Sequence, residues 1–68
     1  MKLYELIQVM NIADVEVCST TIPELYGCYH KKVDMFHKQE DLILRKYGDH
    51  EVEKLTNVAK AGDVIWIK

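Results

Sequence analysis

The spacing of apolar residues changes from helical to alternating within the first twenty residues of the chain. The apolar positions of the first pattern are Leu3, Leu6, Ile7 and Met10. Their spacing predicts an amphipathic helix over residues 2–10, which is too short to be stable unless it packs on an apolar surface. Residues 14–20 then alternate, with Val15 and Val17 on one face. This predicts a half-buried strand that ends before Pro23, because proline cannot donate to a strand ladder.

The middle of the chain predicts a second strand and a second helix. Residues 25–30 are the strand candidate, which would pair with the first strand as a loose hairpin. Asp34 is a candidate N-cap for a helix that ends at Tyr47, with Gly48 as its left-handed stop. The ion pairs expected on this helix are Asp34 with Lys38 and Asp41 with Arg45.

The apolar sector of this second helix is interrupted. Gln39 and Lys46 fall inside it. A helix that starts nearer Gln39 is therefore the alternative, and it would leave Met35 and Phe36 in the connection.

The last part of the chain predicts two more strands. Residues 51–58 are rich in β-branched side chains, the Ala61-Gly62-Asp63 run predicts a turn, and residues 64–68 carry apolar groups on both faces. The last pattern is typical of a central strand. The order α-β-β-α-β-β predicts an α+β fold, in which residues 1–68 form a single small two-layer domain. We expect a mostly antiparallel sheet of about four strands, with two helices on one face.

The size of the chain limits its core. A domain of 68 residues buries only about 60% of the surface of its unfolded chain, so it commonly needs a disulfide, a metal or a partner surface for stability. The cysteines Cys18 and Cys28 allow one disulfide at most. No secretory leader pattern opens the sequence and no apolar run suggests a membrane span, so we expect a cytoplasmic protein with reduced thiols and no membrane contact.

Side chains able to bind a metal or act as nucleophiles are few. The candidate ligands are Cys18, Cys28, His30 and His37. The two cysteines are ten residues apart, whereas structural zinc sites usually space paired ligands by two to four residues, so we expect no metal and no cofactor. Cys28 with a histidine base has the residue types of a cysteine nucleophile, but no glycine-rich loop accompanies it. We therefore expect a protein that is not an enzyme.

The net charge of −2 argues against general attraction to nucleic acid, although the middle of the chain is basic. The candidate nucleic-acid contacts there are Lys31, Lys32, Lys38, Arg45 and Lys46. Asp34, Glu40 and Asp41 interrupt them. The alternative interpretation is a solvated basic edge with the aromatic side chains, including Phe36, packed beneath it.

Large aromatic side chains are frequent for so small a core, and such rings are favoured at protein interfaces. The candidate partner-binding residues are the rings Tyr26, Tyr29 and Trp66 and the acidic residues Asp14, Glu16 and Glu24 of the first half. The acidic residues would imitate nucleic-acid charge toward a basic protein. Because neither a disulfide nor a metal is expected, we predict a homodimer that forms through a sheet edge or the helix face.

The Met1-Lys2-Leu3-Tyr4-Glu5-Leu6 opening, the Val15-Glu16-Val17 strand and the terminal Val64-Ile65-Trp66-Ile67 run resemble a group of short phage and prophage proteins of Gram-positive bacteria. Many of those proteins have a turn and a Tyr-x-Gly stretch after the first strand, where this chain has Pro23-Glu24-Leu25-Tyr26-Gly27. The resemblance implies a phage setting and transfers no functional residue.

The leading hypothesis is therefore a non-enzymatic accessory or anti-defence protein, such as an inhibitor of a CRISPR effector, that binds a host protein or complex stoichiometrically. The first alternative is a nucleic-acid-binding regulator that uses the basic segment between residues 31 and 46. The second alternative is a sponge for a small signalling nucleotide, held at a subunit interface with tyrosine rings stacked on its base.

Overall fold

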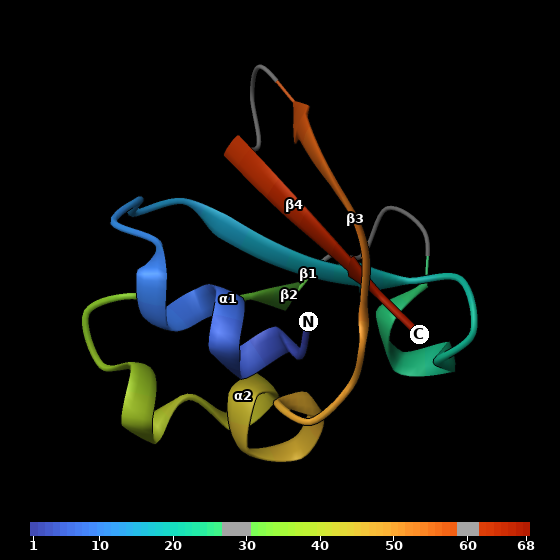
Figure 1. Ribbon diagram of the computed structural model, residues 1–68, viewed down its shortest axis with the longest axis horizontal. Coiled ribbons are helices and arrows are strands. Elements are labelled where there is room, and N and C mark those ends of the chain that lie inside the picture. The colour runs from blue at the N-terminus through green and yellow to red at the C-terminus, as the bar shows by residue number, and fades with distance from the viewer. Residues whose placement is uncertain (27–30, 59–61) are drawn as a thin grey trace.

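The computed structural model describes residues 1–26, 31–58 and 62–68, which form two helices packed on a twisted sheet (Figure 1). The helices are α1 (Leu3–Val9) and α2 (Leu42–Tyr47), and the short 3₁₀ helices are η1 (Pro23–Leu25) and η2 (Lys38–Glu40). The strands are β1 (Val15–Ser19), β2 (Lys31–Lys32), β3 (Val52–Val58) and β4 (Gly62–Ile67). The predicted α+β class is confirmed.

The sheet has the order β2-β1-β4-β3 and is mixed. The two central strands, β1 and β4, are parallel, whereas β2 and β3 pair antiparallel with their neighbours at the two edges. The central position of the last strand is confirmed. The expected set of about four strands is not confirmed, because β2 contributes only two residues within the described part of the chain. The sequence predicted a mostly antiparallel sheet and not the parallel pair at its centre.

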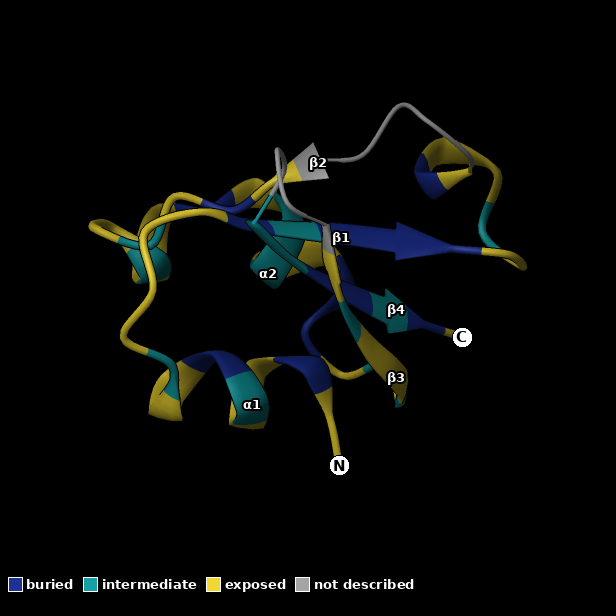
Figure 2. Cartoon of the chain, turned by 90° about the horizontal axis from the view of Figure 1, so that it is seen from above, coloured by how far each residue is buried: buried dark blue, intermediate teal, exposed yellow. Residues whose placement is uncertain are grey.

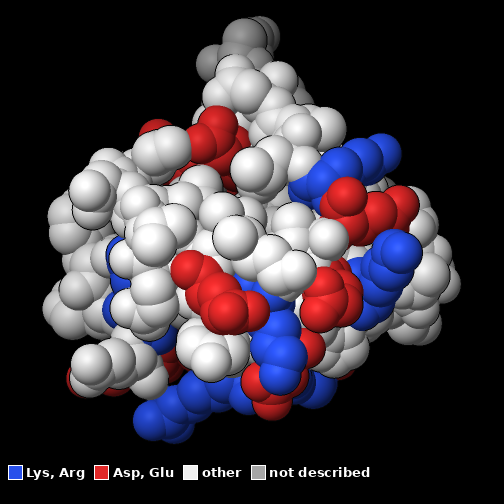
Figure 3. All heavy atoms as spheres, viewed as in Figure 1, with Lys and Arg blue, Asp and Glu red and all other residues white. Residues whose placement is uncertain are grey.

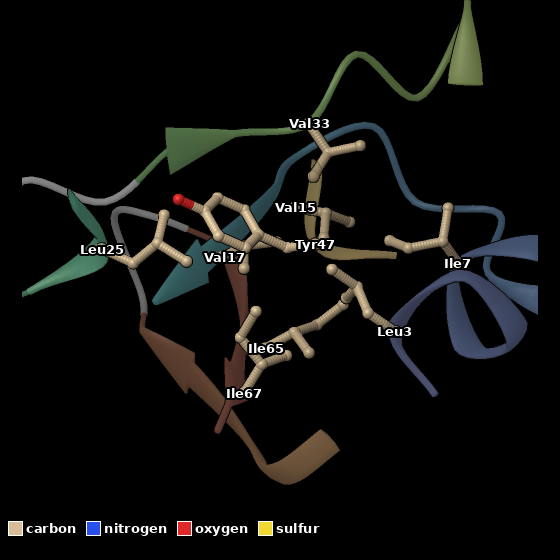
Figure 4. Packing of buried hydrophobic residues seen from close by; sticks show 9 residues of the cluster. All are labelled: Leu3, Ile7, Val15, Val17, Leu25, Val33, Tyr47, Ile65 and Ile67. Atoms are coloured by element: carbon tan, nitrogen blue, oxygen red, sulfur yellow. The ribbon is translucent and has the colours of Figure 1, made fainter. Parts of the chain in front are cut away.

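The hydrophobic core lies between the helices and one face of the sheet (Figures 2 and 4). It consists of Leu3, Ile7, Val15, Val17, Leu25, Val33, Tyr47, Ile65 and Ile67. Val17 and Ile65 are opposite each other in the parallel register, and Leu3 and Ile7 from α1 pack against this pair of strands. The predicted helix and first strand are thus confirmed, since α1 buries its apolar stripe on the alternating apolar face of β1.

The N-terminal segment adds to the sheet edge before α1 begins. Lys2 forms an isolated antiparallel bridge with Glu51, and the Leu3 N–H donates to the His50 carbonyl at 2.9 Å. The Met1 ammonium group lies 2.9 Å from the Glu51 carboxylate and holds the pKa of that carboxyl below its usual value. The start of β3 is therefore tied to the start of α1, which is how a seven-residue helix is held in place.

The predicted helix from Asp34 to Tyr47 is wrong in its first half. Residues 34–41 form a turn followed by η2, and only Leu42–Tyr47 is α-helical, so the alternative start nearer Gln39 is closer to the structure. Asp41, rather than Asp34, is the N-cap, because its carboxylate accepts the Leu44 N–H. Gly48 is not a left-handed stop, since its φ is −56°.

The predicted second strand is wrong where it can be compared. Leu25 belongs to η1 and its side chain is buried in the core, and Tyr26 caps η1 in an extended conformation. The remainder of the predicted strand, residues 27–30, lies outside the described residues. β1 ends at Ser19, before Pro23 as predicted, and Pro23 itself starts η1, because its fixed φ suits the first position of a helix.

The far face of the sheet carries no helix from the described residues and holds a second small group of side chains. Trp66 on β4 donates its indole N–H to the Thr56 hydroxyl at 2.9 Å, and the Lys54 ammonium group lies 4.8 Å from the centre of the Trp66 ring. Cys18 and Val64 on this face are buried, and burial raises the pKa of the Cys18 thiol. This keeps the thiol in its unreactive protonated form at neutral pH.

Candidate functional site

Residues 34–41, named here the Phe36 loop, present an aromatic side chain to solvent. One Asp34 oxygen accepts the backbone N–H groups of Phe36 and His37, each at 3.1 Å. The other Asp34 oxygen lies 3.2 Å from the His37 ring nitrogen Nδ1. This side-chain turn leaves the Phe36 side chain 83% exposed.

The hydrogen bonds at Asp34 also affect its titration. Desolvation of the carboxylate raises its pKa, but the hydrogen bonds from the His37 backbone, the His37 ring and the Phe36 backbone outweigh it. The pKa of Asp34 is therefore lower than usual, so the carboxylate stays charged at neutral pH and keeps accepting from the turn.

Both ends of the Phe36 loop meet at Asp41. One oxygen of this buried carboxylate accepts the Asp34 N–H at 2.7 Å, and the other accepts the Leu44 N–H at 3.0 Å. Asp41 thus closes the loop and caps α2 at the same time. The sequence contained this signal, because an aspartate immediately before an apolar run is a standard N-cap, but Asp34 offered the same signal seven residues earlier.

Lys38 ties the Phe36 loop to the end of α1. Its ammonium group donates to the carbonyl oxygens of Ile7 and Met10, at 2.9 and 3.0 Å. The Ile7 carbonyl also accepts the Met10 N–H at 3.3 Å, so the cation adds to the hydrogen bonding at the end of α1 and complements the helix dipole. The expected ion pair of Lys38 with Asp34 is wrong for this reason.

Two hollows lie beside Phe36, and both are lined by Met35, Phe36 and Lys38. One, of about 250 Å³, extends over residues 10–13 at the end of α1, and the other, of about 340 Å³, extends over Gln8 and residues 37–40. We name the larger apolar side chains that line the first hollow the Phe36 patch. It consists of Met10, Ile12, Met35 and Phe36.

The prediction that Phe36 packs beneath a basic edge is wrong. The signal in the sequence was the interruption of the helical apolar sector, which left Met35 and Phe36 in the connection under the alternative interpretation. That alternative did not indicate whether the ring would be covered. Its exposure depends on the Asp34 turn, which only the structure shows.

The structure spreads the predicted acidic contacts over two places. Asp14 pairs with Lys32 at 3.2 Å, and Glu16 lies opposite Lys32 in the sheet register. Glu24 lies apart from them on η1, where its carboxylate pairs with Lys46 at 2.5 Å and accepts the Tyr47 hydroxyl. The hydrogen bond to Glu24 raises the pKa of Lys46, and the same partner raises the pKa of Tyr47.

The predicted aromatic contacts that the structure describes come from different elements. Tyr26 is exposed after η1, and Trp66 lies on the far face of the sheet, bonded to Thr56. Tyr29 lies outside the described residues.

The basic residues are also dispersed. Lys32, Lys38 and Lys46 each have an oxygen partner within the chain, Arg45 is exposed on α2, and Lys31 is placed only by its pairing with Val17. Figure 3 shows acidic and basic side chains interspersed on one face rather than separated into patches.

Side chains able to bind a metal do not gather within the described residues, where no group of three or more His, Cys, Asp or Glu side chains is placed to hold one. Of the candidate ligands, Cys28 and His30 lie outside this part, and His37 is bonded to Asp34. The described helices include none that is long and apolar enough to cross a membrane.

Comparison of the chain with protein-family models, with curated proteins and with solved structures finds no match. The functional argument therefore depends on the geometry of the Phe36 loop and its surroundings.

Proposed function

We propose that the protein acts by stoichiometric, non-enzymatic binding to another protein, and that the Phe36 patch is its contact surface. The observation that supports this proposal is the exposed Phe36 ring on a loop held by Asp34, Lys38 and Asp41. Burial of such a ring removes a large apolar area from water, and aromatic side chains are common among the residues that dominate binding energy. A loop that is already fixed loses little entropy when a partner binds.

The proposed partner is a host protein or complex, and the proposed setting is that of a phage accessory or anti-defence protein in the host cytoplasm. The resemblance of the opening helix, first strand and last strand to short phage proteins supports this setting. Inhibition of an immune effector such as a CRISPR complex is the most specific form of the proposal.

The acidic and aromatic residues remain predicted contacts. Asp14 and Glu24 each pair with a lysine of the same chain, so part of their negative charge is neutralised before a partner binds. A basic partner would have to compete with these lysines for the carboxylates, which lowers the net gain from charge imitation. Binding through the Phe36 patch requires no such competition. The patch is therefore the first surface to test.

The two alternative functions also remain predictions. A nucleic-acid contact through Lys32, Lys38 and Lys46 would compete with the partners that these lysines have within the chain. It predicts an affinity that falls steeply with salt, so a flat salt response counts against it. The second alternative, a sponge for a small signalling nucleotide, predicts that such a nucleotide copurifies with the protein, which mass spectrometry would detect.

The proposal is tested by capture from host lysate with three baits: the wild type, Phe36→Ala and Leu42→Ala. Leu42 is the matched control, because its side chain is 75% exposed and lies on α2 outside the patch. We expect a partner that the wild type and Leu42→Ala retain equally and that Phe36→Ala loses. Equal retention by all three baits would remove the patch from the proposal, and capture of no protein by any bait would remove the proposed function.

A further inference from the structure

The described residues leave most of the outer edge of β3 open. β3 pairs with β4 on one side, and on the other side these residues cover only its start, where Val52 donates its N–H to the Met1 carbonyl at 2.8 Å. Among the described residues, no strand lies against the edge from residue 53 to residue 58. An edge of this length is a template for pairing with another strand.

The sheet register identifies which backbone groups this edge offers. The Asp63 N–H donates to the Asp14 carbonyl at 3.1 Å, so Asp63 directs its backbone groups toward β1. Asn57 and Leu55 lie opposite Asp63 and Ile65 in the antiparallel pair. Because hydrogen-bonded pairs alternate along an antiparallel ladder, these two β3 residues direct their own N–H and C=O groups outward.

The side chain at the middle of this edge is apolar and uncovered. Leu55 lies opposite Ile65, so it projects on the face of the sheet that carries the helices. Ile65 is fully buried, whereas Leu55 is 54% exposed. The apolar surface of that face therefore continues to the edge without being covered there.

We infer that β3 pairs antiparallel with β3 of a second copy of this chain, about a two-fold axis at Leu55. In this register Leu55 lies opposite its own copy, Lys54 opposite Thr56 and Glu53 opposite Asn57, so no like charges meet. An axis at Lys54 would oppose two lysines, and an axis at Thr56 would place Leu55 against Asn57. The Leu55 register is the one that both pairs the exposed leucines and uses the outward backbone groups.

The same geometry explains why pairing would stop at two copies. A two-fold axis makes the pairing mutual, so the β3 edge of each copy is occupied by the other copy. Within the described residues, β2 at the opposite edge of the sheet offers only two residues. A second copy at β3 therefore closes a symmetric dimer instead of starting a fibre. Edge pairing alone is small for an interface, so the dimer should be weak and dependent on concentration.

The proposal is tested by sedimentation equilibrium of the wild type, Leu55→Lys and Leu42→Lys from low micromolar to near-millimolar concentration. Two lysines at the two-fold axis repel each other, so we expect Leu55→Lys to weaken the dimer at least about tenfold. Leu42→Lys changes an equally apolar, exposed position away from the edge and should leave dimerisation unchanged. A wild type that is monomeric throughout, or a dimer that Leu55→Lys does not weaken, overturns the proposal.

Cross-linking tests the register. In a hydrogen-bonded antiparallel pair the Cα atoms are about 5.5 Å apart, which is within the range of disulfides. In a Cys28→Ser background, Leu55→Cys should therefore form a disulfide dimer about ten times faster than Asn57→Cys. Equal rates contradict the Leu55 axis. Because Phe36 lies outside this edge, Phe36→Ala should dimerise normally, so the dimer and the proposed partner binding can fail separately.

Discussion

At the scale of single residues, Gly62 shows how one position permits the parallel pairing at the centre of the sheet. Its φ is +78°, a conformation that side-chain-bearing residues rarely adopt. A Cβ atom there would lie 2.6 Å from the Asp14 carbonyl oxygen, which accepts the Asp63 N–H of β4. Both the conformation and the space therefore require glycine where β4 begins to run beside β1.

Gly62→Ala should lower the free energy of unfolding by about 2 kcal/mol or more, because strain and a backbone clash add together. Urea denaturation measures this change. Thr20→Ala, at an exposed position, is the control and should be nearly neutral. An alanine variant as stable as the wild type would show that β1 and β4 do not approach as closely as described.

Asp34 gives a prediction about pH. Its pKa is lower in the folded protein, so its charged form stabilises the fold above the unfolded pKa, and that contribution is lost as pH falls through the folded pKa. The difference in free energy of unfolding between the wild type and Asp34→Asn should therefore narrow as pH falls below about 5. Asp49→Asn, on the exposed α2–β3 connection, controls for the change in net charge. A gap that is constant with pH would contradict the hydrogen bonds assigned to Asp34.

At the scale of elements, Lys38 links the Phe36 loop to α1. A helix of seven residues cannot be stable alone, so its end depends on contacts such as the bonds from Lys38 to the Ile7 and Met10 carbonyls. The same bonds hold η2, and with it the Phe36 loop, against the end of the helix.

Lys38→Met keeps the apolar stem of the side chain but removes the ammonium group. We expect it to lower the free energy of unfolding by about 1 kcal/mol and to speed amide hydrogen exchange at the end of α1. Arg45→Met removes a cation from the exposed face of α2 and should do neither. If the two variants behave alike, the contact between Lys38 and α1 is not formed in solution.

The elements differ in how far the sequence determines them. α1 and β1 were predicted because each buries an apolar pattern of the correct period, and β4 because its short run is apolar on both faces. The first half of the predicted second helix failed because Asp34 and Asp41 are equally good caps, and the choice depends on whether Lys38 reaches the end of α1 or stays beside Asp34. The choice is decided by the tertiary contact of Lys38 with the end of α1, about thirty positions away in the sequence. A local sequence pattern holds no information about such a contact.

At the scale of the whole molecule, the parallel pairing of β1 and β4 could not be predicted from local patterns. Only β4 carries the apolar pattern of a central strand, and the adjacency of β1 and β4 depends on how the chain between them returns across the sheet. The arrangement leaves β3 at one edge and the Phe36 patch at the end of α1. The proposed dimer and the proposed partner contact therefore use different surfaces of one small domain.

The central claim is that the exposed Phe36 ring provides the binding energy for a protein partner. Isothermal titration calorimetry of the captured partner with the wild type, Phe36→Ala and Leu42→Ala tests it most directly. We predict that Phe36→Ala raises Kd by about tenfold or more while its thermal stability stays unchanged, and that Leu42→Ala binds like the wild type. A Kd for Phe36→Ala equal to that of the wild type would contradict the account.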